Sequence, residues 1–561
     1  MSDREKILLV LLPFWTPLIP PMGMASLKGF LQGHGYRVKT VDLNVDDRFK
    51  DIYRRYFAEL QEIVPAENRG NFHNVGKDVL QNHSLAYSRA TDQKEGRDLV
   101  RQLIDRTFFC PADEVHITRL QQIMADFYLA LKDYWLSLLE RERPSVLGLS
   151  VYEGTLPASL FAAKLTRQVY PDIRIVMGGG IFAEQLAPGS PNWESFQREV
   201  TYIDRIVIGE GENLFLKYLK EELPPSRKIY TLQDIGGQTL DLADAVLPDF
   251  SDFDLPLYPY LAAYTSRSCP FQCKFCSETV QWGKYRKKEA GQIVSELETL
   301  RSRYGGQLFL MCDSLLNPVI TPLSRALLKS DLAVYWDGYL RADPEVCDID
   351  KVWLWRQAGY YRARLGIESG SPAVLELMGK KITPERIRQA ISNLAFTGIK
   401  TTTYWVIGYP GETEQAFQET LDLVKALRND IYEAWCSPFY FYPTGQINSA
   451  EWSKKCYPLY PEKYDEMLLI KTWVQDVAPS RAETYQRVRR FVDHCKNLDI
   501  PNPFSLHQVY EADRRWKMLH QNAVPSVVDF EKKGETIDES RNIQQLVLAT
   551  STQSHEGDFA F

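Results

Sequence analysis

RSCPFQCKFCSE, residues 267–278, is the segment from which the rest of the chain can be interpreted. It holds Cys269, Cys273 and Cys276 in the spacing CxxxCxxC, whereas the other six of the nine cysteines stand alone. Three thiolates in one short loop can converge on one small inorganic body. A four-iron four-sulfur cluster bound by three cysteines has one iron without a protein ligand. The spacing therefore predicts a [4Fe–4S] cluster with one position open for a small molecule.

Zinc is the alternative interpretation of the three cysteines. Structural zinc favours four closed ligands, often supplied by two CxxC pairs. The sequence offers no second pair and no nearby histidine to complete such a set. A disulfide framework does not suit a chain of 561 residues that begins MSDREK, without the apolar core of an export signal. We therefore expect a cytoplasmic protein with reduced cysteines.

Strand and helix patterns alternate six times around the cysteine segment, over residues 257–448. Apolar, strand-like runs are predicted at 260–266, 308–313, 334–341, 361–368, 400–407 and 435–441. Helical patterns such as 291–303 and 384–396 separate them. Six units, rather than eight, predict a partial (β/α)6 barrel whose chemistry lies at the C-terminal ends of its strands.

Residues 1–222 predict a different α/β unit. Strand patterns at 6–12, 36–43, 145–151, 173–179 and 204–212 alternate with helical ones, as in a doubly wound, Rossmann-like sheet. An insertion at about 45–143 predicts a helical cap, and the Pro- and Asp-rich stretch 223–256 predicts a linker. Residues 449–561 predict a mainly helical region with a polar tail after residue 533.

The composition excludes several classes of function. The chain is 44% hydrophobic and 25% charged with a net charge of −7, an ordinary globular balance. Its short basic run, KYRKK at 284–288, is too small for a nucleic-acid footprint. No apolar stretch reaches membrane-spanning length. We expect neither a nucleic acid nor a membrane as partner.

The cysteine motif, with the aromatic Phe275 before its last cysteine, resembles the radical S-adenosylmethionine (SAM) superfamily. The resemblance implies that SAM binds the open iron and is cleaved reductively to a 5′-deoxyadenosyl radical. The family's usual Gly-Gly-Glu after the second strand is absent, and CDSLLN stands there, with Asp313 as the best substitute. The cofactor shell that the resemblance implies comprises Phe275, Asp313, Arg341, Glu368, Ser369 and Gly408.

The N-terminal unit resembles the cobalamin-binding domain that precedes many radical SAM enzymes. The resemblance rests on PPMGMASLKGFLQGHGYRV, GLSVYEG, GGGIFAE and GEGE. The cobalt-binding element Asp-x-His-x-x-Gly is missing, because PFWTPLIPPMG follows the first strand without a histidine. This implies cobalamin bound base-off with no histidine ligand. The implied cobalamin contacts are Ser150, Val151, Gly178, Gly179, Gly180 and Glu210.

Together these resemblances imply a cobalamin-dependent radical SAM enzyme, most often a C-methyltransferase acting on an unactivated carbon. The implied substrate is a small molecule or peptide of natural-product biosynthesis, and the implied electron donor is a flavodoxin or ferredoxin. Rearrangement or cyclisation by the same cofactors is one alternative. An iron–sulfur electron carrier or sensor without enzymatic activity is another. The sequence assigns no catalytic residue.

Overall fold

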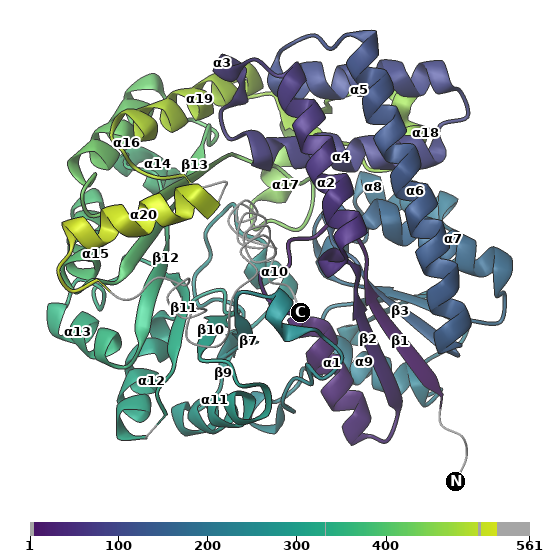
Figure 1. Ribbon diagram of the computed structural model, residues 1–561, viewed down its shortest axis with the longest axis horizontal. Coiled ribbons are helices and arrows are strands. Elements are labelled where there is room, and N and C mark those ends of the chain that lie inside the picture. The colour runs from purple at the N-terminus through teal and green to yellow at the C-terminus, as the bar shows by residue number, and fades with distance from the viewer. Residues whose placement is uncertain (1–4, 331, 503–505, 524–561) are drawn as a thin grey trace.

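The computed structural model describes residues 5–330, 332–502 and 506–523, and it contains two parallel sheets side by side (Figure 1). The N-terminal sheet, at the lower right of the figure, faces the barrel-like sheet on the left. The predicted polar tail lies outside the described residues. In the described part of the chain no helix is both long and apolar enough to cross a membrane.

The N-terminal sheet is six-stranded and entirely parallel, in the order β2-β1-β3-β4-β5-β6, which confirms the doubly wound prediction. Its strands are β1 (Lys6–Leu11), β2 (Arg37–Asp42), β3 (Val146–Ser150), β4 (Arg174–Gly178), β5 (Arg205–Ile208) and β6 (Ile229–Thr231). The helices between them are α1 (Met22–Gly33), α7 (Leu156–Val169), α8 (Pro191–Glu199) and α9 (Gly211–Leu219).

One strand of this sheet falls in the stretch predicted as a linker. β6 pairs in parallel with β5, so the N-terminal domain continues past residue 222. Three residues are too few to give an alternating or apolar pattern that distinguishes a strand from an extended linker. The remainder of that stretch, up to residue 256, contains short 3₁₀ turns.

The insertion between β2 and β3 consists of five helices that form the upper right of Figure 1. They are α2 (Asp47–Ile63), α3 (Ala66–Arg69), α4 (Phe72–Arg89), α5 (Gln93–Phe108) and α6 (Glu114–Glu142). Several begin at an aspartate whose side chain accepts a hydrogen bond from the first turn, as at Asp46, Asp92 and Asp113. The central helix, α4, is largely buried among its neighbours.

The second sheet is also parallel, in the order β14-β13-β12-β11-β10-β7, and confirms the partial barrel. Its strands are β7 (Leu261–Ala263), β10 (Leu308–Met311), β11 (Tyr335–Leu340), β12 (Tyr360–Glu368), β13 (Lys400–Ile407) and β14 (Glu433–Pro438). Its helices are α10 (Glu278–Trp282), α11 (Ala290–Tyr304), α12 (Asn317–Lys329), α13 (Ile349–Gln357), α14 (Pro372–Leu377), α15 (Pro384–Phe396) and α16 (Glu414–Ala426).

The first predicted barrel strand is divided in two. After β7 the chain turns into β8 (Ser266–Arg267), which pairs antiparallel with β9 (Arg286–Lys287). The backbone N–H of Thr265 donates to the Asp313 carboxylate, at 3.0 and 3.1 Å from its two oxygens, instead of continuing the ladder. The cysteine loop therefore starts from a short hairpin that Asp313 fixes at the barrel rim.

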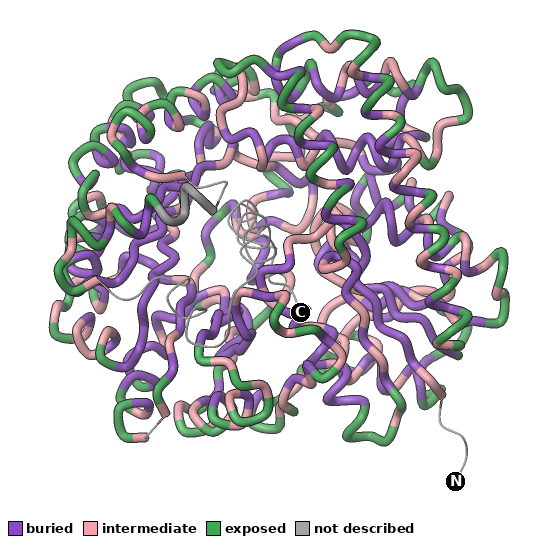
Figure 2. Tube along the Cα trace, in the orientation of Figure 1, coloured by how far each residue is buried: buried purple, intermediate pink, exposed green. Residues whose placement is uncertain are grey.

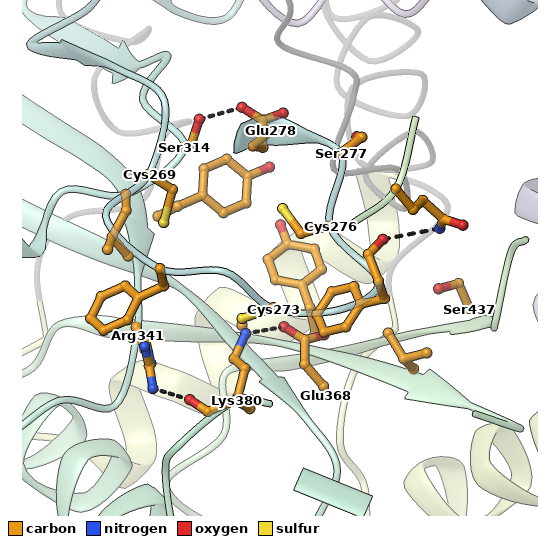
Figure 3. Close-up of a pocket in the computed structure, with 18 of the residues that line it drawn as sticks. Cys269, Cys273, Cys276, Ser277, Glu278, Ser314, Arg341, Glu368, Lys380 and Ser437 are labelled. Carbon is orange, nitrogen blue, oxygen red and sulfur yellow. Dashed lines mark hydrogen bonds and ion pairs between the residues drawn. The ribbon is translucent and has the colours of Figure 1, made fainter. Parts of the chain in front are cut away.

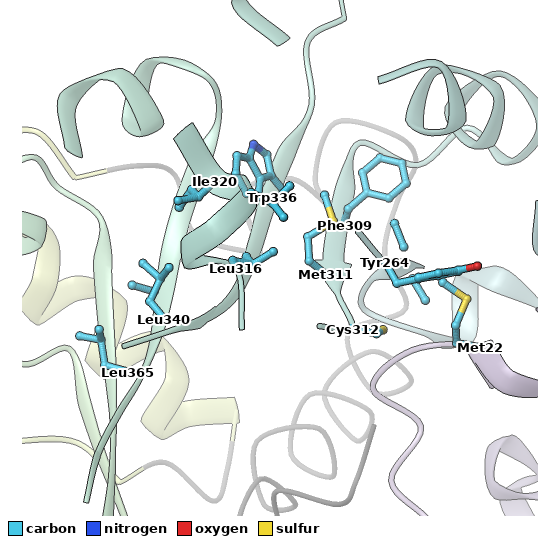
Figure 4. Close-up of a cluster of buried hydrophobic side chains, with 14 of the residues drawn as sticks. Met22, Tyr264, Phe309, Met311, Cys312, Leu316, Ile320, Trp336, Leu340 and Leu365 are labelled. Carbon is cyan, nitrogen blue, oxygen red and sulfur yellow. The ribbon is translucent and has the colours of Figure 1, made fainter. Parts of the chain in front are cut away.

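A continuous apolar core runs through both sheets and joins them. Figure 2 shows the strands buried and the outer helices exposed on one side. In Figure 4 Met22 of the N-terminal domain lies beside Tyr264, and the barrel residues Met311, Leu316 and Trp336 belong to the same apolar cluster. Burial of this much apolar surface fixes the two sheets relative to each other.

The described part of the C-terminal region is mainly helical, as predicted, and also contains two short strands. It contains α17 (Ser449–Trp452), β15 (Cys456–Pro458), α18 (Asp465–Leu468), β16 (Trp473–Gln475), α19 (Arg481–Asn497) and α20 (Leu506–Leu519). β15 and β16 form an antiparallel pair. The helix α19 packs on β14 and α18 packs on α4, so this region bridges the barrel and the insertion.

Candidate cofactor and active site

The three cysteines of the motif line one cavity of about 200 Å³ at the C-terminal ends of the barrel strands (Figure 3). Backbone hydrogen bonds to neighbouring segments hold their loop. Lys274 N donates to Met378 O at 2.9 Å, and Ile447 N donates to Cys276 O at 3.2 Å. The loop is thereby tied to the end of α14 and to the turn after β14, which presents all three thiols to the same space.

The three thiols do not form a site for a single metal ion, because within residues 5–330, 332–502 and 506–523 no three His, Cys, Asp or Glu side chains close around one position. A four-iron cluster takes its cysteines at separate corners. Burial, together with the nearby Cys273, raises the pKa of the Cys269 thiol to about 11, so ligation would have to displace its proton.

Arg341, which follows β11, lines this cavity and has a guanidinium nitrogen without a hydrogen-bond acceptor among the described residues. Its side chain is 5% exposed, and its guanidinium lies 3.7 Å from the centre of the Phe271 ring in the cysteine loop. One terminal nitrogen, Nη2, donates to Lys380 O, whereas the buried Nη1 has no hydrogen-bond acceptor in the structure. A buried guanidinium donor without an acceptor suits a ligand carboxylate, which is the group expected of SAM.

Glu368, at the end of β12, also lines the cavity, but in an ion pair. Its Oε1 atom lies 2.6 Å from Nζ of Lys380, and both side chains are less than a tenth exposed. Glu368 has a φ of 67°, in the left-handed region, at the point where the register between β12 and β13 shifts. Lys380 was not predicted, because it stands in the turn after α14 and not at a strand end.

Asp313 lies at the cavity with most of its acceptor capacity used by the protein. In addition to the Thr265 N–H, it accepts from the hydroxyls of Thr265 at 2.7 Å and Ser266 at 2.5 Å. Burial raises its pKa to about 6 even though these hydrogen bonds oppose the shift. Its visible role is to fix the start of the cysteine loop.

The other three predicted SAM residues differ in position. Phe275 lines the cavity, and its carbonyl accepts from Gln446 Nε2 at 3.0 Å. Ser369 does not line the cavity, and its hydroxyl lies 3.2 Å from that of Thr420. Gly408, with a φ of 78°, donates its N–H to Glu412 Oε1 at 3.1 Å and borders a neighbouring cavity.

The cavity contains a further acid that sequence reasoning missed. Glu278, two residues after the last motif cysteine, is buried on α10 and accepts from the hydroxyl of Ser314. Burial raises its pKa to about 7 against the effect of that hydrogen bond. Its position within the motif segment was a signal, but sequence alone did not show that it points inward.

A second cavity lies at the C-terminal ends of the N-terminal strands. Four of the predicted cobalamin residues line it, namely Ser150, Gly178, Gly179 and Glu210. Val151 and Gly180 do not line it. Val151 is fully buried, and a Cβ added to Gly179 would lie 2.3 Å from its carbonyl oxygen, so Val151 instead supports the glycine turn. Gly148, Gly209 and Gly211, which were not predicted, also line this cavity.

Glu210, in the N-terminal domain, forms ion pairs with two arginines beside the cysteine loop and so links the two domains. Its carboxylate pairs with Arg286 and lies 3.2 Å from Nη1 of Arg267, two residues before the first motif cysteine. The neighbouring Glu212 lies 2.5 Å from Nη2 of Arg267. All of these carboxylates are less than a tenth exposed, so a buried ion network fixes the glycine-lined cavity relative to the cysteine loop.

Comparisons with known proteins agree with this arrangement. Residues 264–424 match the Radical SAM superfamily. The chain is 25% identical over 317 residues to the anaerobic magnesium-protoporphyrin IX monomethyl ester cyclase of Rubrivivax gelatinosus, covering 52% of this chain and 55% of that protein. It is 24% identical over 315 residues to the cobalamin-dependent radical SAM methyltransferase TokK of Streptomyces tokunonensis, covering 49% and 44%. The chain spans about half the length of the curated relatives it matches.

Two solved structures share the fold along nearly the whole chain. The radical SAM methyltransferase TsrM from Kitasatospora setae, with cobalamin and a [4Fe-4S] cluster bound, has a TM-score of 0.53 at 15% identity, covering 98% of this chain and 99% of that one. The cobalamin-dependent radical enzyme OxsB, with aqua-cobalamin and SAM bound, has a TM-score of 0.53 at 14% identity, covering 97% and 72%.

The cysteine loop at the rim of a partial barrel, together with the match over that barrel, identifies residues 264–424 as a domain of the Radical SAM superfamily. The doubly wound domain in front of the barrel places the chain more narrowly. With that domain in front of the barrel, the chain has the fold of the cobalamin-dependent radical SAM enzymes TsrM and OxsB.

Proposed function

We propose that this enzyme is a C-methyltransferase that uses a [4Fe–4S] cluster, SAM and cobalamin to methylate an unactivated carbon of a small-molecule or peptide natural product. One observation carries the proposal. Trp282 lines both the cysteine cavity and the glycine-lined cavity, so the two cofactor spaces meet at one side chain. A cofactor that spans both can face the cluster with one end and bury the other in the N-terminal sheet.

The residues of each cavity fit the group assigned to it. Cys269, Cys273 and Cys276 would hold the cluster, and Arg341 would donate to the SAM carboxylate. The ion pair of Glu368 and Lys380 would border SAM on the barrel side. When bound, the cluster supplies the electron that cleaves SAM, and cobalamin supplies the methyl group. The protein positions both and excludes water.

The glycine-lined cavity would take the nucleotide tail of cobalamin. Its lining glycines leave room beside the strand ends for a large planar group. Among the described residues no histidine lines either cavity, which supports base-off cobalamin without a histidine ligand. Paramagnetic resonance of the cob(II) form tests this point. We expect no nitrogen superhyperfine splitting from an axial ligand, and its presence would refute the assignment.

Product analysis tests the methyl transfer. With substrate, reductant and SAM, we expect S-adenosylhomocysteine and 5′-deoxyadenosine together, with a substrate mass increase of one methyl group. Cyclisation or rearrangement would give 5′-deoxyadenosine without stoichiometric S-adenosylhomocysteine, and would replace this proposal. That second candidate is favoured by the relatives named as cyclases. We propose a flavodoxin or ferredoxin as the electron donor in either case.

A further inference from the structure

A third cavity, which we call the amine pocket, opens from the cysteine cavity and contains none of the residues assigned to cofactors except Gly408. Pro438, Phe439, Tyr440 and Tyr442, at and after the end of β14, line both spaces. Its other walls come from the insertion, from the turn after β3 and from residues 459–485 of the C-terminal region. Helix α4, which supplies Asp78 to this pocket, packs against α18 where the insertion meets the C-terminal region (Figure 1).

Two carboxylates line this pocket, and no ion pair with either is present among the described residues. Asp78 on α4 accepts from the Tyr440 hydroxyl at 3.4 Å, and Glu153 accepts from Gln185 Nε2 at 3.2 Å. The guanidinium of Arg481, on the same wall, donates to Arg106 O and lies 4.2 Å from the centre of the Tyr485 ring.

Burial disfavours the ionised form of both acids, so a bound cation would stabilise their negative charge. Burial, and then repulsion from Glu153, raises the pKa of Asp78 to about 8, although Arg481, Tyr440 and Lys77 act in the opposite direction. Burial likewise raises the pKa of Glu153. Two enclosed acids this close are costly to ionise unless a cation lies between them.

A third acceptor in the pocket is unused. The side-chain oxygen of Gln475, on β16, is buried and accepts no hydrogen bond. An ammonium group has three N–H donors, and Asp78, Glu153 and Gln475 together offer three acceptors. Aromatic rings make up much of the remaining wall, and such rings favour organic cations over their faces. The rings that line the pocket are Phe439, Tyr440, Phe441, Tyr442, Tyr460, Trp473 and Tyr485.

We propose that the amine pocket binds the substrate, and that the substrate carries a protonated amine held by Asp78, Glu153 and Gln475, with the carbon to be modified directed past Tyr440 into the cysteine cavity. This inference rests on the proposed function, because it supplies that reaction with its substrate class.

Calorimetric binding of matched probes tests the inference on the anaerobic holoenzyme with cluster, cobalamin and SAM. The probes are 2-phenylethylamine and 2-phenylethanol, which share a skeleton and differ in the charged group. We expect the amine to bind at least about tenfold more tightly, because a buried charge-assisted hydrogen bond is worth about that much. Asp78→Asn and Glu153→Gln, made separately, should each reduce this preference at least about threefold. Glu62→Gln, an exposed acid of the same insertion, should leave it unchanged.

Equal binding of the two probes, no binding of either, or an undiminished preference in both variants would overturn the inference. Iron content and substrate-free 5′-deoxyadenosine formation, measured on the same samples, show that each variant is folded and loaded. They also separate this inference from the proposed function. If the wild type prefers the amine but yields no S-adenosylhomocysteine with substrate, the amine pocket is supported and the proposed methyl transfer is refuted. If it methylates a substrate but does not prefer the amine, methyl transfer is supported and the amine pocket is refuted.

Discussion

Nζ of Lys380 lies 2.6 Å from Oε1 of Glu368, and this pair forms one wall of the cavity that holds the motif cysteines (Figure 3). Both side chains are buried, so neither charge could remain there alone without a large desolvation penalty. Lys380 therefore holds this carboxylate in place at the cavity wall. This arrangement predicts that Glu368 affects SAM binding more than it affects the cluster.

Glu368→Gln should retain its iron and weaken SAM binding about tenfold, because the neutral amide no longer balances Lys380 or accepts as strongly from a ligand donor. Formation of 5′-deoxyadenosine in the absence of substrate should slow accordingly at limiting SAM. Iron analysis and a SAM titration of this reaction measure both effects. Glu376→Gln, an exposed acid on nearby α14, is the control. Normal cleavage with a defect only in substrate turnover would assign Glu368 to substrate recognition.

The strand-end residues of this site could be predicted because parallel strands all end at one rim. Arg341 and Glu368 each close a periodic apolar run, and a run of that kind is visible in sequence. Lys380 and Glu278 could not be found in this way. Their positions depend on how a turn after α14 and a short helix after the cysteines fold back into the cavity. Those contacts come from tertiary packing and leave no periodic signal.

The same distinction applies to the N-terminal cavity and to the amine pocket. Gly178 ends a clear strand and Gly179 follows it, whereas Gly211 stands at the start of a helix and looked like an ordinary turn residue. Asp78 lies in the middle of a helix in an insertion that was interpreted only as a cap. Its function depends on contact with Tyr440, which is 362 residues away in the chain.

Only the three motif cysteines should ligate the cluster. Cys312 and Cys436 line the same cavity and are therefore the sharpest controls. Burial raises the pKa of both thiols well above its usual value, which disfavours the thiolate that binds iron. Changing Cys269, Cys273 or Cys276 to alanine should remove most iron and all SAM cleavage. Cys312→Ala and Cys436→Ala should keep iron at the wild-type level, and loss of iron from either would refute the assignment.

Filling the glycine-lined cavity should exclude cobalamin and spare the cluster. A Cβ added to Gly211 meets no atom within 4 Å, so Gly211→Leu can place its side chain in the cavity without a clash in the fold. Leucine also suits the first turn of α9 better than glycine does. We expect cobalamin affinity, followed by absorbance, to fall at least about tenfold, the effect of losing one or more well-placed contacts. Gly33→Leu, at an exposed and equally open position, should bind cobalamin normally.

The ion pair between Arg267 and Glu212 should couple stability to pH. Arg267→Met leaves Glu212 and Glu210 buried near the glycine-lined cavity with less compensating charge. Breaking a buried pair in this way costs about 3 to 5 kcal/mol. The thermal unfolding midpoint at pH 7 should therefore fall by several degrees, and cobalamin binding should weaken because the two domains lose their tie. Lys454→Met, which removes an exposed pair with Glu451, should change the midpoint very little.

The sign of the pH dependence follows from Glu212. Burial alone would raise its pKa, but attraction to Arg267 and their hydrogen bond outweigh burial, so the pKa lies below its ordinary value of 4.5 in the folded protein. The folded state then binds fewer protons than the unfolded state. This stabilisation is fully present above about pH 4.5 and is lost as the pH falls through the lowered pKa.

In Arg267→Met the buried carboxyl of Glu212 has no such partner, and protonation removes the desolvation penalty of its charge. The stability difference between wild type and Arg267→Met should therefore shrink as the pH is lowered from 7 to 4. A difference that stays constant over this range would show that Arg267 acts through packing against Tyr264 and Trp282, whose ring centres lie 5.4 and 5.7 Å from its guanidinium, and not through charge.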